Sequence, residues 1–90
     1  MKILHLTIKK KWFDMIVSGV KKEEYREIKP YWNMRLNKSY DVVEFKNGYG
    51  PQSPVARFKI IEILRGLGII EWGAPEGRPV YIIRLGERKD

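Results

Sequence analysis

Residues 18–32, SGVKKEEYREIKPYW, decide how the rest of the chain is organised. Gly19 suits the left-handed backbone position just past the end of a helix. Lys21, Glu24 and Arg26 follow it into a predicted strand. Buried charge is costly unless it is paired, so charged side chains in the middle of so small a protein indicate a role beyond solubility. We therefore expect this segment to line a cleft.

The alternation of side chains along a strand over residues 21–28 sorts these charges. Glu24 and Arg26 fall on the same face, about 6.6 Å apart along the strand. Lys21 has the opposite parity, and it joins the same site only if it lies in the turn before regular pairing starts or if a bulge intervenes. Two alternatives remain: an exposed edge strand with alternating charge, or a Glu24–Arg26 ion pair that only fixes the strand register.

Composition removes several classes of chemistry. The 90 residues are enough for one domain, expected to span residues 1–90, and 43% of them are hydrophobic, which favours a packed core. Cysteine is absent and His5 is the only histidine, so disulfides, thiolate chemistry and histidine-based zinc sites are excluded. We expect no metal and no cofactor. A lone histidine in a strand is more often structural, and His5 is assigned no role.

The sequence carries no predicted membrane or export segment. No apolar stretch approaches the roughly 18 residues that a membrane span needs. The N-terminus lacks the basic, apolar and small-residue order of a signal peptide. We therefore expect no membrane partner and a cytoplasmic location, with the oligomeric state left open.

Positive charge is concentrated in the first part of the chain. The formal net charge is +7, from 18 Lys and Arg against 11 Asp and Glu. Residues 1–40 hold ten basic and four acidic side chains, a net charge of +6, and residues 41–90 hold eight and seven, a net charge of +1. Local basic charge of this kind favours a polyanionic partner, and RNA or a nucleotide fits that requirement.

Hydrophobic periodicity predicts the fold. Alternating apolar residues predict strands at residues 2–8, 21–28, 41–45, 54–64 and 78–85, and apolar residues at helical spacing predict helices at residues 9–18 and 30–37. Closing the sheet removes the exposed edges of a small open one. We predict an α+β, mainly β fold: a small, closed or nearly closed β-barrel of about five to six strands, with one N-terminal helix and one or two short helices. An open α+β sheet is the alternative.

A run of three lysines, Lys9, Lys10 and Lys11, stands at the start of the first predicted helix. Cations beside the positive end of a helix dipole cost about 0.3–1 kcal/mol each at low salt, and a bound anion relieves that cost. We interpret the run as a rim that contacts phosphate. The alternative is a solvated loop with no ligand.

Aromatic and polar residues on the helices and loops complete the predicted binding surface. Trp12, Trp32 and Arg35 are candidates for stacking on a base, although aromatic residues at helical spacing are as often part of the core. The turn-rich segment NGYGPQSP carries Asn47 and Tyr49 on a loop able to approach a ligand closely, or it is a plain hairpin loop. Two further candidates, Glu71 and Trp72, stand at the centre of RGLGIIEWGAPEG.

The spacing Gly19-x-Lys21-x-x-Glu24-x-Arg26 resembles the G-x-K-x-x-E-x-R signature of ASCH domains, which belong to the PUA-like superfamily. The segments LHLTIKKKWFDMIVSG, EYREIKPYW, FKNGYG and EWGAPEG…VYIIRLG resemble small stand-alone ASCH proteins in the same order, so the resemblance covers nearly the whole chain. It implies a PUA-like β-barrel with a cleft beside the signature and RNA or a nucleotide as ligand. It also implies that Lys21 and Arg26 are the cationic groups of the cleft and Glu24 its acid.

Two functions follow as hypotheses. The first is an RNA- or nucleotide-binding domain without turnover. The second is a small hydrolase acting on a modified nucleoside or on RNA, because one branch of ASCH proteins hydrolyses the amide of N4-acetylcytidine with a lysine at the Lys21 position. In that branch a threonine stands at the position that Glu24 occupies in this chain. In the second hypothesis the carboxylate of Glu24 acts instead as a general base toward water. In this second hypothesis Lys21 and Glu24 are catalytic, and Glu71 supplies a second acid.

Overall fold

Seven helices and strands and one 3₁₀ turn follow one another along the chain. A computed structural model describes residues 1–90. The elements, in order, are β1 (Ile3–Thr7), α1 (Lys10–Val17), β2 (Glu23–Arg26), α2 (Pro30–Leu36), β3 (Val42–Lys46), β4 (Val55–Gly66), the 3₁₀ turn η1 (Ile70–Trp72) and β5 (Val80–Arg88). The fold is α+β and mainly β, which confirms the predicted class.

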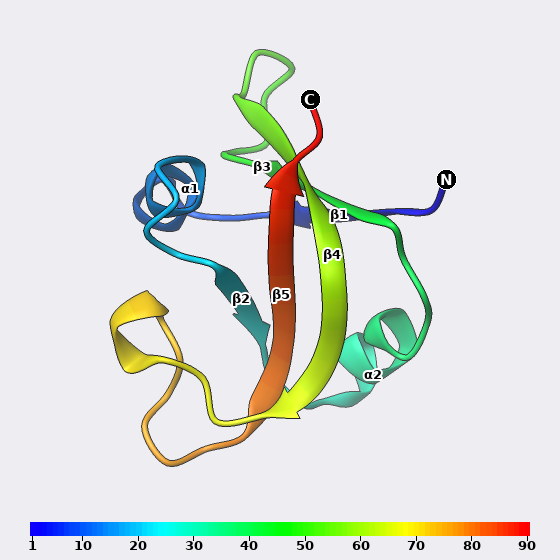
Figure 1. The fold of residues 1–90 in the computed structure, drawn as a ribbon, viewed down its shortest axis with the longest axis vertical. Coiled ribbons are helices and arrows are strands. Elements are labelled where there is room, and N and C mark those ends of the chain that lie inside the picture. The colour runs from blue at the N-terminus through cyan, green and yellow to red at the C-terminus, as the bar shows by residue number, and fades with distance from the viewer.

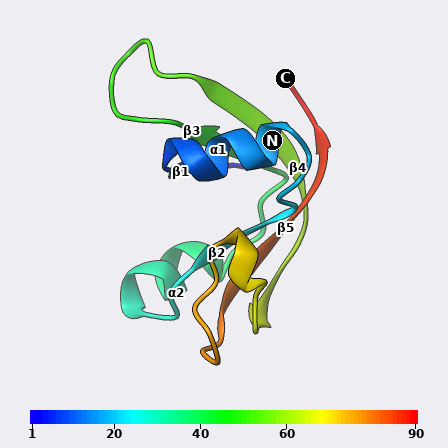
Figure 2. The ribbon, with the colours of Figure 1, turned by 90° about the vertical axis from the view of Figure 1, so that its left-hand side faces the viewer.

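The five strands form one mixed sheet in the order β1-β3-β4-β5-β2. β1 pairs with β3 in parallel, and the other three pairs are antiparallel. The sheet curls into a half-barrel, so that β1 crosses behind the long β4–β5 ribbon, and the views in Figure 1 and Figure 2 place α1 and α2 at opposite ends of it. The register between β4 and β5 shifts twice, between Phe58 and Ile60 and between Ile60 and Glu62, and such irregularities bend a strand. β1 and β2 are the two edge strands, and no backbone ladder joins them.

The interior of the half-barrel is apolar. Leu4, Leu6 and Ile8 alternate along β1 and its end as the sequence predicts, and all three are buried. Phe13 and Ile16 of α1 pack on them. The rest of this core comes mainly from the three interior strands: Val43, Phe45, Ala56, Phe58, Ile60, Tyr81, Ile83 and Leu85, with Leu36 from α2.

A smaller apolar cluster lies on the other face of β2 and β5. Tyr25, Ala74, Val80 and Ile82 are its buried members, and Trp72 packs against it. The loop that carries η1 therefore folds back beside β2, as both views show. Gly68 makes this approach feasible, because a Cβ at that position would lie 2.6 Å from a ring carbon of Tyr25.

The second strand is shorter than predicted. Residues 21–28 were expected to be extended, but β2 covers only Glu23–Arg26. The N–H of Lys21 still donates to the carbonyl of Met15 in α1, and Pro30 begins α2 soon after the strand ends. Gly19 has a φ of 87°, which confirms the left-handed turn expected there. Lys21 thus lies in the turn before pairing starts.

The remaining boundaries differ from the predicted ones by a few residues. β4 ends at Gly66 and β5 runs to Arg88, because their mutual pairing continues past the apolar runs that predicted them. Neither helix has the length or the unbroken apolar sequence needed to cross a lipid bilayer.

Candidate functional site

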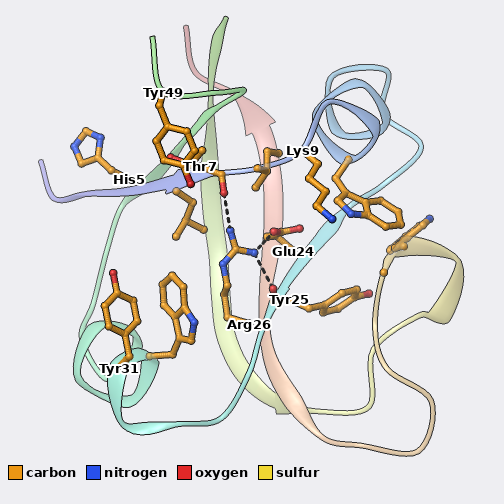
Figure 3. Close-up of a pocket in the computed structure, with 14 residues that line it drawn as sticks. His5, Thr7, Lys9, Glu24, Tyr25, Arg26, Tyr31 and Tyr49 are labelled. Atoms are coloured by element: carbon orange, nitrogen blue, oxygen red, sulfur yellow. Dashed lines mark hydrogen bonds and ion pairs between the residues drawn. The ribbon is translucent and has the colours of Figure 1, made fainter. Parts of the chain in front are cut away.

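A cleft opens between the two edge strands, where the half-barrel is not closed by backbone hydrogen bonds. Its volume is about 560 Å³, within the range of about 300–1,000 Å³ of small-molecule sites. Side chains from β1, β2, both helices and the two long loops surround it (Figure 3). The lining residues are His5, Leu6, Thr7, Ile8, Lys9, Trp12, Glu24, Tyr25, Arg26, Tyr31, Trp32, Tyr49, Trp72 and Gly73.

Glu24 is the acidic centre of this cleft. Its side chain is 6% exposed, and each carboxylate oxygen faces a cation. Oε1 lies 3.2 Å from Nζ of Lys21, and Oε2 accepts a hydrogen bond from Nη1 of Arg26. The two cations hold the carboxylate in one orientation, because rotating it would break both pairs at once. Glu24 is thus a fixed hydrogen-bond acceptor at the cleft surface.

Lys21 lies behind Glu24 and is almost completely buried, with 1% of its side chain exposed. Its Nζ also donates to the carbonyl of Trp72 and lies 4.9 Å and 4.8 Å from the ring centroids of Trp12 and Tyr25. Burial lowers the pKa of Lys21 below its usual value, and the nearby Glu24 carboxylate opposes that shift. Lys21 does not line the cleft, so it acts on anything bound there through Glu24.

Arg26 joins the two edge strands. Besides Glu24, its Nη1 donates to the carbonyl of Tyr25 at 2.8 Å, and its Nη2 donates to the carbonyl of Thr7 in β1 at 3.3 Å. The guanidinium also lies over the ring of Trp32, 5.2 Å from its centroid. Nε and one Nη2 hydrogen have no partner in the chain. Since no buried side-chain nitrogen lacks a partner, that Nε reaches solvent.

Aromatic rings surround the ion pair. Tyr31 and Trp32 of α2 pack edge to face, with ring centroids 4.8 Å apart. Trp12 and Trp72 line the other part of the cleft, near Lys21. None of the three indole N–H groups has a hydrogen-bond partner in the chain, and no buried side-chain nitrogen lacks one, so all three reach solvent. Tryptophan N–H groups in apolar surroundings normally find a partner, and these three find none within the chain.

The lysine run divides among three environments. Lys9 is exposed and lines the cleft. Lys10 pairs with Asp14 at 2.6 Å, one helical turn further on, and Lys11 lies over the ring of Trp12 at 4.6 Å. The other two therefore have partners within α1, and only the first reaches the ligand space.

Besides Lys10, Lys11 and Lys21, three more predicted site residues lie outside the cleft lining. Arg35 stacks on Tyr31 at 3.8 Å from its ring centroid, which occupies its guanidinium within α2. Asn47 donates from Nδ2 to the carbonyl of Ile8 at 3.2 Å and so fastens the β3–β4 loop to the end of β1. Glu71 is exposed on η1 and does not line the cleft, although its neighbour Trp72 does. Tyr49, in contrast, lines the cleft and is 91% exposed.

The cleft also contains residues that the sequence did not identify. His5 and Thr7 belong to it because β1 is an edge strand, which alternation alone does not reveal. Tyr25 and Tyr31 stand beside predicted site residues in the sequence, and that adjacency is the only signal that marks them. Gly73 enters because its positive φ of 102° places the loop against Trp12.

No group of three or more His, Asp or Glu side chains is arranged to hold a metal ion. A scan against protein-family models found no match, and neither did searches of the curated proteins and of the solved structures. The residues of the cleft therefore carry the functional interpretation.

Proposed function

We propose that this cleft binds a nucleotide, and that the protein is an RNA- or nucleotide-binding domain. One observation supports the proposal above the others: aromatic rings surround a fixed carboxylate and an arginine with two unused donors. Aromatic faces stack on bases of any sequence, contributing about 1–3 kcal/mol per base. A nucleotide offers a flat base, hydrogen-bonding edges and a phosphate, and the cleft has a complement for each.

Charge favours a nucleotide over a cationic ligand. Carboxylates within aromatic cages also suit quaternary ammonium groups. In this cleft, however, both oxygens of Glu24 are already paired with cations, and Lys9 adds a further positive charge at the rim. The local charge is therefore positive and suits a phosphate. The lone pairs that remain on Glu24 can accept from the amino or imino groups of a base.

The proposal agrees with the ASCH-like spacing of Gly19, Lys21, Glu24 and Arg26, and we propose membership of that family on the same grounds. In this arrangement Arg26 and Lys9 contact phosphate, and Glu24 contacts the base. Lys21 pairs with Glu24 and orients it. Trp12, Trp32, Tyr49 and Trp72 provide stacking surfaces.

Binding of a mixed-sequence single-stranded RNA octamer, followed by tryptophan fluorescence, tests the proposal. With about two phosphate contacts, raising salt from 50 to 200 mM weakens binding about sevenfold, since the slope is about −0.7 per contact. Trp32→Ala should reduce affinity, whereas Met34→Ala, exposed on the same helix and outside the cleft, should not. No detectable binding at 50 mM salt would refute the proposal.

Hydrolysis is a second candidate function, favoured by the position of Glu24. A carboxylate fixed at the cleft surface can take a proton from water as that water attacks the acyl carbon of N4-acetylcytidine. The same proton then passes to the exocyclic nitrogen, and acetate and cytidine leave. Lys21 is too buried to touch the substrate and acts by orienting Glu24.

Turnover of N4-acetylcytidine and of single-stranded RNA tests this second function. Glu24→Gln keeps the shape of the side chain and removes the base, so it should abolish turnover while RNA binding persists. Lys21→Met should lower any turnover, because Glu24 then loses the partner that orients it. No turnover by the unaltered protein, or equal turnover by the Glu24→Gln variant, excludes this mechanism.

A further inference from the structure

The aromatic residues of the cleft form two separate groups. The first group comprises Tyr31 and Trp32 of α2, and the second comprises Trp12, Tyr25 and Trp72; Tyr49 lines the cleft from the β3–β4 loop. Figure 3 shows Tyr31 and Tyr49 on one side of Arg26, and Lys9 and Tyr25 on the other. The cleft is therefore aromatic at both ends and polar at its centre.

The polar centre is a continuous row of contacts. Trp32 lies against the guanidinium of Arg26, Arg26 is bonded to Glu24, and Glu24 is paired with Lys21. Nζ of Lys21 in turn lies 4.9 Å from the ring centroid of Trp12. Because the whole ion-pair row lies between Trp32 and Trp12, one base cannot stack on both rings. A mononucleotide therefore leaves one aromatic group uncovered.

We propose that the cleft holds two consecutive nucleotides of a single RNA strand, one base at each aromatic group, with the linking phosphate over Arg26. This inference rests on the nucleotide-binding function proposed above. The unpartnered Nε and Nη2 hydrogens of Arg26 are the donors for that phosphate, and the exposed Lys9 is the second cation beside it. Stacking on protein rings requires bases that are not stacked in a duplex, so the strand is single.

The size and shape of the cleft support two nucleotides. It is an open groove of about 560 Å³ bounded by segments from both edge strands. Tyr49 is 91% exposed, so its ring is open to stacking. Trp12 lines the other end of the cleft, and Lys11 over its ring and the close approach of Gly73 hold it in place.

The test compares ligands of different length by calorimetry at low salt. The probes are the four ribonucleoside 5′-monophosphates and the sixteen ribodinucleoside monophosphates. The tightest dinucleotide should bind at least about tenfold more tightly than the tightest mononucleotide, because it covers a second stacking surface. Replacing either base of that dinucleotide by hydrogen, which leaves an abasic sugar, should return the affinity to that of a mononucleotide.

Variants at the two ends provide the matching protein-side test. Trp32→Ala and Trp12→Leu should each lower dinucleotide affinity at least fivefold, with Met34→Ala as the unaffected control and thermal unfolding as the check on folding. The abasic ligands keep the inference testable if Trp12→Leu does not fold. If mononucleotides bind as tightly as dinucleotides, the two-base arrangement is wrong while nucleotide binding stands. If no ribonucleotide or RNA binds, both are wrong.

Discussion

The curled sheet is held together in two different ways. β3, β4 and β5 are joined by backbone ladders, and the side chains beneath them are apolar, with Val43, Phe45 and Ile83 completely buried. The two edge strands β1 and β2 have no ladder between them, and there Arg26 reaches across to the carbonyl of Thr7. Backbone pairing closes one part of the half-barrel, and a charged side chain spans the other.

This difference separates stability from function. Burial of apolar side chains contributes roughly 25 cal/mol per Å² and needs no partner of special chemistry. Burial of Lys21 and Glu24 costs desolvation that their mutual attraction only offsets. The gap between β1 and β2 is a seam bridged by side chains, which is the less stable way to join two strands, yet it leaves the Glu24 carboxylate and the Arg26 guanidinium at its surface. Those groups are the ones that line the cleft.

The largest expected change in the free energy of unfolding is in the part of the sheet joined by backbone ladders. Phe45→Ala removes a fully buried ring from the interior core and should lower the free energy of unfolding by about 3–5 kcal/mol. Urea unfolding followed by circular dichroism measures it. RNA affinity of the molecules that remain folded should not change. A loss below about 1 kcal/mol would contradict the packing described, and Phe45→Leu, a smaller change, serves as the control.

The next effect is at the seam. Glu24→Ala leaves the ammonium group of Lys21 buried without a counter-charge, and the expected loss of unfolding free energy is about 3 kcal/mol. Glu24→Gln retains an acceptor for Lys21 and Arg26 and should lose about half as much. Urea unfolding of the two variants side by side measures the difference. Equal, small losses in both would mean that the ion pairs do not hold the seam.

A smaller effect is expected where the η1 loop meets β2. Gly68→Ala introduces a methyl group 2.6 Å from the Tyr25 ring and 2.7 Å from Cβ of Ala74, and it should cost about 1–3 kcal/mol. Gly50→Ala is the matched control, because its methyl group would meet nothing closer than 3.7 Å. Thermal unfolding of both variants makes the comparison. A neutral Gly68→Ala variant would show that the loop is not packed against Tyr25.

The smallest effect concerns alkaline pH. Burial raises the pKa of Tyr25 above its ordinary value, so the folded protein keeps the phenol proton at a pH where the unfolded chain has lost it. The folded state then binds more protons, and this group's contribution to stability is lost as pH rises above about 10. Burial lowers the pKa of Lys21, so just below pH 10.4, the ordinary value of about 10.4 for lysine, the unfolded chain binds more protons than the folded one. The contribution of Lys21 to stability therefore rises with pH in that range, opposite to that of Tyr25.

Tyr25→Phe isolates the first of these contributions. At pH 8 the variant should be less stable by about 1 kcal/mol, because the hydroxyl accepts from the N–H of Ile69 and donates to Glu23. This deficit should shrink as pH rises above about 10, because only the unaltered protein loses the contribution of the Tyr25 phenol to the free energy of unfolding. Urea unfolding at pH 8 to 11 measures it. A deficit that stays constant with pH would show that the phenol is not buried as described.

Much of the fold was predictable because its signals are local. Alternation along residues 2–8 identified the apolar face of β1, and Gly19 marked the end of α1 through its left-handed turn. Strand parity correctly placed Glu24 and Arg26 on the same face of β2. Whether Lys21 reaches the same site depended on where pairing with β5 begins, and that is a tertiary feature.

The candidate site was only partly predictable. Trp12 and Trp32 were identified by residue type, but Arg35 and Asn47 turn out to have partners of their own outside the cleft lining. His5 was set aside because nothing in a single strand's pattern shows that it lies at a sheet edge. Residue type indicates what a side chain can do, whereas its neighbours decide whether it is available.

The sequence by itself determined the secondary structure, the apolar faces and the set of charged residues around Gly19, because periodicity and backbone preference act over a few residues. Tertiary structure alone decided that β1 and β2 would be the two edge strands, with no ladder between them, and that the cleft would lie there. The physical reason is that strand order depends on how all five strands share one core. Only that arrangement places Glu24 between Lys21 and Arg26 and brings three tryptophan side chains to the cleft.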